Sequence, residues 1–488
     1  MDRLSALPRP ILHAILAKLP DKDAAKTIAL SKAWRDTWFS FPYLSVCSDD
    51  PMIFDLRFCN VDILVGYVTK RLLRLHDQGL AIKEFKLNLK MLKPTQLSHN
   101  HFDRWIQIAS ESGIEVLELY LPGGRIGREY GQRNWYILPL CVPQAKSLTK
   151  LLLSSGIRVD REFLSRSMKF SSLKMLSLCY VRFTHEGILQ NLVSHCPLIE
   201  HLYVENCFVY NVISTEDPVD RFDMVKSLFL NGFQKLKEVH VQGIQESTII
   251  SDKWFLELFS KYPFLESLKL DGCPMSETIN ITSARLKVLK LFHCSNLKEV
   301  NIDAPHLISL DYCGFEKLVI SLMTCSDKLE VSVDTRVDYQ HSYSLRDFIQ
   351  NMPQKILASL SLIISPSYRE SDPSELIPAF QVFSNTPPRI KHLELRERAV
   401  PSREVFYGHL MHCLLSSCFP EKISFSLVMG NSDAFIEFFY EMLMGSKKGE
   451  CHCSSGNTKC WWHALKIVNI SRSFLPDKPK TITYSLEM

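Results

Sequence analysis

The sequence contains no run of apolar residues that approaches the roughly 20 needed to span a bilayer. It also lacks a secretory signal pattern, because Met1-Asp2-Arg3 leads directly into a proline-broken amphipathic segment. The formal net charge is only +4 over 488 residues, which argues against a dedicated nucleic-acid binder. We therefore expect neither a membrane nor a nucleic acid among the partners of this chain.

The motifs of common catalytic sites are missing as well. The sequence has no G-x-S-x-G, no H-E-x-x-H and no cysteine in a recognisable catalytic context. The glycine-rich stretch 123–131 lacks the Lys-Ser/Thr ending of a phosphate loop, so a surface loop between structural elements is favoured there. We expect no catalytic residue, no cofactor and no enzymatic activity.

Cysteine is plentiful but is not arranged as a disulfide framework. The fifteen cysteines are an odd number, scattered from Cys47 to Cys460, which is typical of reduced thiols in the cytosol or nucleus. Zinc-type ligands gather only near the C-terminus, at Cys451, Cys453, Cys460 and His463. Their spacing is not that of a standard pair of zinc knuckles, so a polar loop is favoured and a metal site is the alternative.

The first 48 residues carry the strongest local pattern. Pro10 suits the first position of a helix and Pro20 ends it. Between the two prolines runs one apolar stripe, formed by Ile11, Leu12, Ile15, Leu16 and Leu19. Asp21 or Asp23 can cap a second helix, and a third follows around Trp34. Three such short helices cannot bury all their apolar surface, so we expect the stripe to remain available to another polypeptide.

These residues resemble the F-box in the version common in plants. The anchors are Leu4-Ser5-Ala6-Leu7-Pro8, Ile11-Leu12, Ile15-Leu16, Leu19-Pro20, Ala24-Ala25, Leu30-Ser31-Lys32 and Trp34-Arg35. Pro10, Lys18 and Ala33 depart from the residues commoner in that family without removing an apolar anchor. The alternative is an ordinary N-terminal helical hairpin packed on its own domain.

The F-box resemblance implies binding of a Skp-type adaptor. The positions that match the family's adaptor-facing and supporting residues are Leu7, Pro8, Ile11, Leu12, Ile15, Leu16, Leu19, Leu30 and Trp34. Through that adaptor the resemblance also implies a cullin as an indirect partner.

A second pattern recurs through the rest of the chain: an apolar residue followed by apolar residues at +3 and +5. It starts at Ile82, Ile114, Leu148, Leu173, Ile199, Val225, Leu236, Leu265, Leu286, Leu297, Leu307, Phe315, Leu357, Ile390 and Leu465. This is the signature of leucine-rich repeats, in which the +3 and +5 residues point inward from a short strand. Because one unit cannot bury its strand alone, the units must stack into one array.

The spacing of these units changes along the chain. Starts at 148, 173, 199 and 225 lie about 25 residues apart and leave room for helices, such as 163–168 and 188–195. Helices are also predicted over 62–76 and 254–262. From 286 the starts come about every 10 residues, which leaves no room for a helix of typical length. We expect the outer side of the array to change there from helices to strands or loops.

Together the two patterns resemble a plant F-box/leucine-rich-repeat protein. The expected fold is α/β: a three-helix F-box followed by a curved solenoid with parallel strands on its concave face and helices, short strands or loops on its convex face. The expected divisions are an F-box at 1–48, a helical connection at 49–80, repeats at 81–365 and a C-terminal repeat-like region at 366–488. A helix at 432–445 is predicted within the last of these.

Residues that flank the inward pair on each strand are expected to line the concave face. They include Tyr203, Glu205, Phe229, His240, Lys269, Asp271, Lys290, Phe292 and Arg396, with Asn231, Glu238 and Glu394 beside them. Charge interleaved with aromatic rings suits a protein or peptide partner, and we assign these positions to target binding. For any single residue the simpler interpretation is a solvated face.

The resemblance implies the substrate-recognition subunit of a Skp–cullin–F-box ubiquitin ligase. One alternative is an adaptor-binding scaffold that promotes no ubiquitin transfer. The other is a hormone-type small-molecule co-receptor, which would need a cationic pocket on the concave floor.

Overall fold

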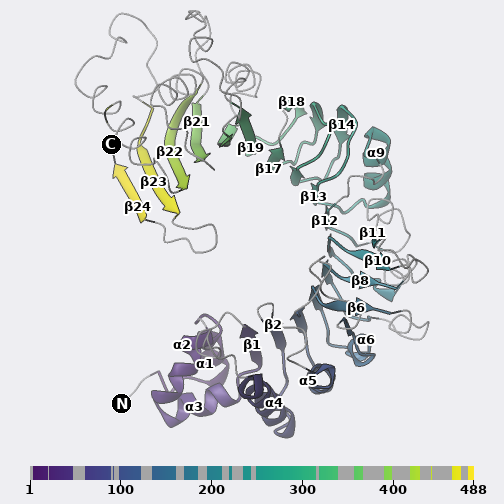
Figure 1. The fold of residues 1–488 in the computed structure, drawn as a ribbon, viewed down its shortest axis with the longest axis vertical. Helices are drawn as coiled ribbons and strands as arrows, with labels where there is room; N and C mark the ends of the chain where they lie inside the picture. Colours follow the sequence, from purple (N-terminus) through teal and green to yellow (C-terminus); the bar gives the residue numbers. More distant parts are fainter. Residues whose placement is uncertain are drawn as a thin grey trace, which may run out of the picture. The chain divides into compact units, whose positions relative to one another are not determined.

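The computed structural model describes residues 4–19, 21–47, 61–89, 92, 98–121, 135–160, 170–184, 195–210, 219–221, 233, 235–242, 249–314, 318–338, 357–365, 389–397, 418–428, 441, 464–473 and 482–487. The chain divides into two compact units, residues 1–244 and 245–488 (Figure 1).

The first unit begins with a group of short helices, here called the N-terminal module (residues 4–41). Its elements are α1 (Arg9–Leu16), α2 (Asp21–Lys26), the 3-10 turn η1 (Thr27–Ala29) and α3 (Lys32–Phe39). Helix α1 ends at Leu16, earlier than Pro20, and Lys18 and Leu19 continue only as hydrogen-bonded turns. Ser31 caps the N-terminus of helix α3: its hydroxyl accepts from the Trp34 amide at 3.3 Å and satisfies one of the unpaired donors of the first turn.

A parallel main sheet follows in the first unit. Its strands, in spatial order, are β1 (Tyr43–Cys47), β2 (Glu84–Asn88), β3 (Val116–Tyr120), β5 (Lys150–Ser154), β7 (Met175–Cys179), β9 (His201–Glu205) and β12 (Glu238–Gln242). Buried and more exposed residues alternate along these strands, and from β2 onward the buried ones are the +3 and +5 residues of the sequence pattern. The leucine-rich-repeat prediction is therefore confirmed for these units.

Helices pack on the buried side of this sheet near its start. The predicted helix over 62–76 is observed as α4 (Val61–Asp77), and α5 (His99–Glu111) packs beside it. Trp105 of α5 is fully buried and donates from Nε1 to the Thr69 hydroxyl of α4 at 2.8 Å, which fixes the register of the two helices. A single turn, α6 (Cys141–Gln144), covers the next repeat.

Farther along the first unit, the structure describes a second group of strands beside the main sheet. The parallel strands β4 (Tyr136–Ile137), β6 (Ile157–Val159), β8 (Arg182–Phe183) and β10 (Phe208–Tyr210) form a second sheet, which the antiparallel β11 (Val219–Arg221) extends. Outer strands are therefore present well before residue 286. The unit spacing predicts that they begin only at that residue. The spacing could not reveal this because each of these strands is only two or three residues long.

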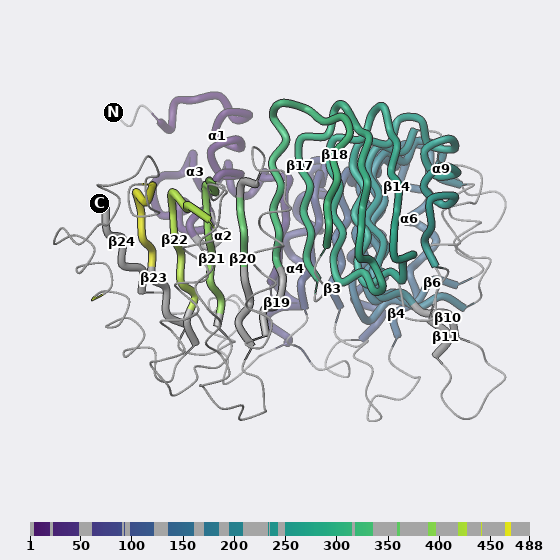
Figure 2. Tube along the Cα trace, turned by 90° about the horizontal axis from the view of Figure 1, so that it is seen from above, coloured from purple at the N-terminus to yellow at the C-terminus, as the bar shows by residue number. Residues whose placement is uncertain are grey.

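Parallel main-sheet strands are also found in the second unit (Figure 2). They are β13 (Ser267–Asp271), β15 (Val288–Phe292), β17 (Ser309–Gly314), β19 (Glu330–Asp338), β20 (Leu357–Ser365), β21 (Arg389–Glu397), β22 (Phe419–Val428) and β23 (Ile467–Ser473), with an antiparallel β24 (Ile482–Glu487) at the end. The predicted helix over 254–262 is observed as α9 (Asp252–Lys261).

After α9, strands within the described residues between 276 and 324 form a second sheet. It consists of β14 (Thr278–Thr282), β16 (Glu299–Asp303) and β18 (Val319–Thr324), all parallel. The predicted change to outer strands is thus confirmed in this region. The units that start at Leu297 and Phe315 belong to this second sheet, so the 10-residue step is two strands, one per sheet, within one repeat of about 21 residues.

A recurring turn closes the main-sheet strands. The residue after the strand takes a left-handed conformation at Ser155, Tyr180, Gly272 and His293, with φ between 49° and 63°. Its amide donates to the carbonyl near the end of the next strand, as from Ser155 to Cys179 at 2.9 Å and from Gly272 to Phe292 at 2.8 Å. This hydrogen bond connects the turn of each repeat to the following strand. It compensates for the left-handed conformation, which most residues other than glycine avoid.

Several sequence-based predictions lie outside the described residues. They are the repeat unit that starts at Val225, the helices at 163–168 and 432–445 and most of that at 188–195, the glycine-rich stretch 123–131, and the zinc-type ligands Cys451, Cys453, Cys460 and His463. No disulfide joins the cysteines that the structure describes. Among the same residues, no helix combines the length and apolar character needed to cross a membrane.

Candidate interaction surfaces

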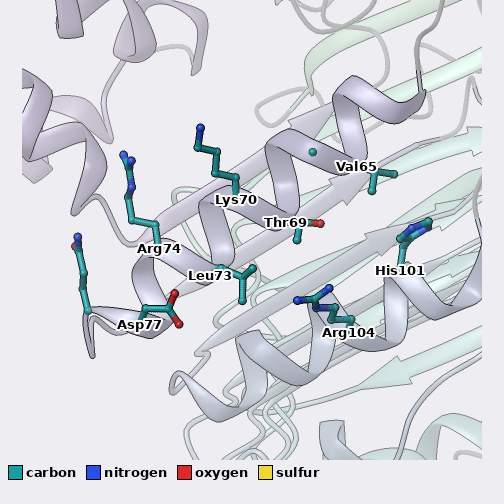
Figure 3. A pocket seen from close by; sticks show the side chains of 10 residues that line it. Val65, Thr69, Lys70, Leu73, Arg74, Asp77, His101 and Arg104 are labelled. Carbon is teal, nitrogen blue, oxygen red and sulfur yellow. The ribbon is translucent and has the colours of Figure 1, made fainter.

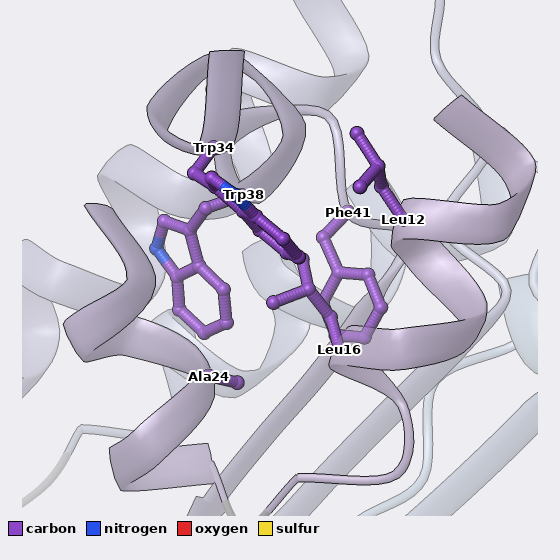
Figure 4. Packing of buried hydrophobic residues seen from close by; sticks show 6 residues of the cluster. All are labelled: Leu12, Leu16, Ala24, Trp34, Trp38 and Phe41. Atoms are coloured by element: carbon purple, nitrogen blue, oxygen red, sulfur yellow. The ribbon is translucent and has the colours of Figure 1, made fainter. Parts of the chain in front are cut away.

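The N-terminal module has a small apolar core of its own. Leu12 and Leu16 of α1 pack with Ala24 of α2 and with Trp34, Trp38 and Phe41 (Figure 4). The rings of Trp38 and Phe41 stack with centroids 5.8 Å apart, and Leu7 and Ile15 lie half-buried against this cluster. The core is therefore built mainly by α1 and α3, with α2 closing one side.

The expectation that the whole stripe of α1 stays uncovered is wrong for Leu12 and Leu16. Both are at most 2% exposed, because they point into the module's core. Trp34, which we also assigned to adaptor binding, is buried in the same core. These residues shape the module from inside, which fits supporting residues better than adaptor-facing ones. None of them lies beneath the repeat strands.

The remaining predicted adaptor residues form the outer side of the module. Ile11 is 46% exposed, Leu19 36% and Leu30 66%, and Pro8 is exposed one turn before Ile11. Leu4, an anchor of the resemblance, is 57% exposed. The Ser5 and Ser31 hydroxyls lie 3.0 Å apart, which holds the segment of Leu4 next to that of Leu30. The outer side thus presents large apolar residues that no described part of the chain covers.

The module is joined tightly to the repeats. Arg71 of α4 donates from Nη1 to the Phe39 carbonyl and from Nη2 to the Phe41 carbonyl, both at 3.1 Å. Its guanidinium lies over the Trp38 ring at 4.9 Å, and that of Arg74 lies over Phe39 at 3.9 Å. Burial lowers the pKa of Arg71 to about 10, which still leaves it charged at neutral pH. Since β1 directly follows the module and pairs with β2, module and sheet are one continuous body at this joint.

A groove of about 680 Å³ lies next to this joint, between α4 and α5 (Figure 3). Val65 and Leu73 form apolar parts of its wall, and Lys70, Arg74 and Arg104 place cations around it, with Asp77 as an acidic residue. Sequence reasoning missed this groove, because its residues come from two helices whose mutual packing is not encoded in a local pattern.

The open face of each main sheet carries the half-buried residues that alternate with the buried ones. In the first unit, the Tyr203 ring lies edge-on to the His240 ring at 6.2 Å on the neighbouring strand. Glu238 accepts from His201 Nδ1 at 2.9 Å. Burial, together with a hydrogen bond to Glu238, raises the pKa of the Tyr203 hydroxyl, so that it stays protonated. These predicted target residues do lie together.

In the second unit, the predicted open-face cations are paired with carboxylates. Lys290 Nζ lies 2.7 Å from Asp311, and Lys269 Nζ lies 3.7 Å from Asp271 and 4.9 Å from the centre of the Phe292 ring. Arg396 contacts Asp334 at 3.2 Å and Glu394 at 3.0 Å. The hydrogen bond to Glu394 raises the pKa of Arg396 further. A cationic pocket for an acidic small molecule is therefore not formed by Lys269, Lys290 and Arg396.

Two known family models match this chain, one over the N-terminal module and one over the repeats. A model of the F-box domain matches residues 4–45. A model described as the At1g61320/AtMIF1 LRR domain matches twice, over residues 72–226 and 219–373. The chain belongs to the F-box/leucine-rich-repeat family.

Relatives of this F-box/leucine-rich-repeat protein occur in Arabidopsis thaliana. It is 29% identical over 275 residues to the FBD-associated F-box protein At4g13985. This match covers 56% of this chain and 52% of that protein. It is 32% identical over 206 residues to the FBD-associated F-box protein At4g10400, covering 42% of this chain and 45% of the relative. A longer match, 24% identical over 404 residues, covers 74% of this chain and 89% of the putative FBD-associated F-box protein At5g50270. For the first two, the chain spans about half the length of the relative.

Two residues predicted for target binding, Phe229 and Asn231, lie outside the described residues. Other residues of the open face of this F-box/leucine-rich-repeat protein were not predicted from the sequence, namely Asp311, Asp334 and Cys313. A 21-residue period, which places Asp271, Phe292, Cys313 and Asp334 at equivalent strand positions, was the signal that could have found them.

Proposed function

We propose that this chain is the substrate-recognition subunit of a Skp–cullin–F-box ubiquitin ligase. In this proposal the N-terminal module binds the Skp-type adaptor, and through it a cullin, while the open faces of the main sheets bind a target protein. The chain acts in the cytoplasm or nucleus and performs no catalysis itself. Membership of the F-box family supports the ligase role.

The observation that carries the proposal is the uncovered apolar side of the N-terminal module. Ile11 and Leu30 are about half or more exposed although both are large and apolar. Completing the burial of such side chains contributes about 1 kcal/mol or more each, and such residues concentrate the binding energy of interfaces. The adaptor-contacting set is therefore narrowed to Pro8, Ile11, Leu19 and Leu30, with Leu7 and Ile15 at its edge and Leu12, Leu16 and Trp34 supporting it from the core.

The joint at Arg71 supports a mechanism based on proximity. A receptor raises the effective concentration of a bound target near a charged conjugating enzyme, and this effect is greatest when the connection is stiff. Two backbone hydrogen bonds from Arg71, together with the continuous β1 strand, provide such a connection between the module and the first main sheet.

The test begins with capture of the target by a full-length chain that cannot enter the ligase. Ile11→Asp with Leu30→Asp is suited to this, because both side chains point outward. Deletion of residues 1–48 is less suitable, since it removes β1 and leaves the edge of β2 and the side chain of Arg71 without their partners.

The captured protein is then offered to a reconstituted ligase that contains the wild-type chain, a Skp-type adaptor, a cullin and a conjugating enzyme. We expect ubiquitin transfer to the captured protein with the wild-type chain and at most background transfer with the double variant. Adaptor binding without transfer would instead favour the scaffold function.

The co-receptor alternative predicts a rise in melting temperature when an acidic small molecule is added. The pairing of the second unit's open-face cations with carboxylates argues against this alternative.

A further inference from the structure

Three side chains from successive repeats meet on the open face of the second unit. Asp271 ends β13, His293 follows β15 directly, and Cys313 lies near the end of β17. These strands are neighbours in the sheet, and Asp271, Phe292 and Cys313 are in register across them. The three residues are about 21 apart in sequence and are brought together only by the repeat.

The contacts among them form a chain from thiol to imidazole to carboxylate. Cys313 Sγ lies 3.6 Å from His293 Nε2, and His293 Nδ1 lies 3.1 Å from Asp271 Oδ1. An ionised carboxylate accepts only, so the imidazole tautomer with its proton on Nδ1 donates to Asp271 and leaves Nε2 as an acceptor for the thiol proton. The linear arrangement agrees with the lack of any metal-binding cluster in the described residues.

The backbone explains why the imidazole reaches both partners. His293 has the left-handed conformation of the repeat turn, with φ 49°, and its amide donates to the Cys313 carbonyl. Ser155, Tyr180 and Gly272 occupy the same kind of turn, so the conformation is a property of the repeat. What is particular to this position is the imidazole, with a carboxylate on one side and a thiol on the other.

We propose that Cys313 is a nucleophilic thiol, activated by His293 and oriented through Asp271, that adds to soft carbon electrophiles of the α,β-unsaturated carbonyl class. His293 Nε2 takes the thiol proton, and the sulfur forms a bond to the β-carbon of the electrophile while the C=C π bond breaks. The proton then passes from the imidazolium to the α-carbon. The net reaction adds S–H across C=C, so it needs no oxidant and expels no leaving group.

The other groups around Cys313 are compatible with this reaction. Phe292 lies beside it on β15 and offers an apolar ring to the body of the electrophile. Asp334, its neighbour on β19, opposes a thiolate, but its charge is offset by Arg396 at 3.2 Å. The pKa of Arg396 is raised chiefly by its bond to Glu394, and the Cys313 thiolate adds to this, which places the guanidinium within electrostatic reach of the sulfur. Asp311, two residues before Cys313, is paired with Lys290 at 2.7 Å.

The first unit contains a matched control, Cys179. It ends β7, and the Ser155 amide donates to its carbonyl as the His293 amide does to that of Cys313. Ser155 offers no imidazole, and the neighbour in register on β9 is Glu205. Burial raises the pKa of the Cys179 thiol to about 12, and the Glu205 charge contributes. The same backbone frame thus holds one thiol beside an imidazole and one hydrogen-bonded to a carboxylate.

The test measures alkylation of each cysteine in the full-length protein. Limiting methyl vinyl ketone or N-ethylmaleimide is added at pH 7, the reaction is quenched at intervals, and site-resolved rates are read by peptide mass spectrometry. We expect Cys313 to react about tenfold or more faster than Cys179, in line with the usual contribution of a positioned general base.

Two variants separate activation from exposure. His293→Asn keeps a residue that tolerates the left-handed turn, as Asn206 does at φ 47°, but removes the base. It should lower the Cys313 rate about tenfold and leave the Cys179 rate unchanged. Asp271→Asn leaves the imidazole in place and should lower the Cys313 rate by a smaller factor.

Equal rates at Cys313 and Cys179, or a Cys313 rate that both variants leave unchanged, would overturn the proposal. The reaction requires neither adaptor nor target, so its failure would leave the receptor function untouched, and the failure of the receptor function would leave the thiol chemistry standing.

Discussion

The N-terminal module and the repeat strands use apolar residues in opposite ways. On the repeat strands the apolar residues of the pattern are buried almost completely, as with Leu289 and Leu291 at 0% and 1% exposure. In the module, two adjacent residues of α1 differ sharply, since Leu12 is 2% exposed and Ile11 is 46% exposed. The strands satisfy their own apolar residues by stacking, whereas the module keeps part of its apolar surface uncovered.

Exposure alone does not make a binding site. Leu256 on α9 is 60% exposed and Ile63 on α4 is 62% exposed, and single exposed apolar residues are common on proteins. In the module, the Ser5–Ser31 contact brings the segments of Leu4 and Leu30 together, and Ile11 lies on α1 of the same module. Contiguity, and not exposure as such, distinguishes an interface from a normal surface.

The largest effect on stability is expected from Leu12→Ala. The variant removes a buried side chain between Trp38 and Phe41 and should destabilise the module by about 3 kcal/mol through lost transfer energy and a cavity. Ile11→Ala, one residue away, should cost less than about 1 kcal/mol. Hydrogen exchange of the α1–α3 amides measures both, and equal protection losses would break the distinction between the two residues.

A smaller effect is expected at the joint, from Arg71→Met. The Phe39 and Phe41 carbonyls lose their donor, which should cost about 2 kcal/mol and free the module from α4. Arg71→Lys keeps the charge but not both bonds, so it should recover only part of this loss. Denaturant unfolding of the full chain measures the loss, and limited proteolysis reports whether residues 39–47 become accessible. Wild-type values for the Met variant would mean that the module and the repeats are not coupled here.

The smallest effect is a pH dependence of the module. Burial, with the charges of Arg9 and Arg71, lowers the pKa of His13 from 6.5. The unfolded chain therefore binds this proton more readily than the folded module, so the module should lose stability as the pH falls below about 6.5 and regain it above. Hydrogen exchange of the α1–α3 amides between pH 7 and 5 follows this loss. An unchanged pH dependence in His13→Gln would show that His13 is not its source.

The sequence predicts the repeat strands well because their rule is local. A start residue followed by apolar residues at +3 and +5 predicted most of the main-sheet strands, such as β2, β5, β13 and β17, in which both of these residues are buried. The same rule missed β1, although Phe41, Leu44 and Val46 have the required spacing, because these residues adjoin the F-box pattern. It missed β19, where Leu329, Val331 and Val333 are buried at a spacing of two.

Features that depend on packing between distant segments could not be predicted. Leu297 and Leu307 start units of the same spacing, yet β16 and β17 lie in different sheets, and only the topology separates them. Likewise, Ile11 and Leu12 are both apolar in one stripe, and the side that faces the core is set by where Trp34 and Trp38 lie. The meeting of Asp271, His293 and Cys313 needs the repeat period, which the local pattern does not contain.

In the proposed function, a Skp-type adaptor covers the exposed apolar side of the N-terminal module. The most direct test is the affinity of the purified full chain for that adaptor, measured by calorimetry for the wild type, for Ile11→Asp with Leu30→Asp, and for Leu256→Asp as an equally exposed control on α9. We expect tight binding for the wild type and the control, and a loss of about 100-fold or more for the double variant with melting temperature unchanged. Equal affinity in all three proteins would contradict the proposed function.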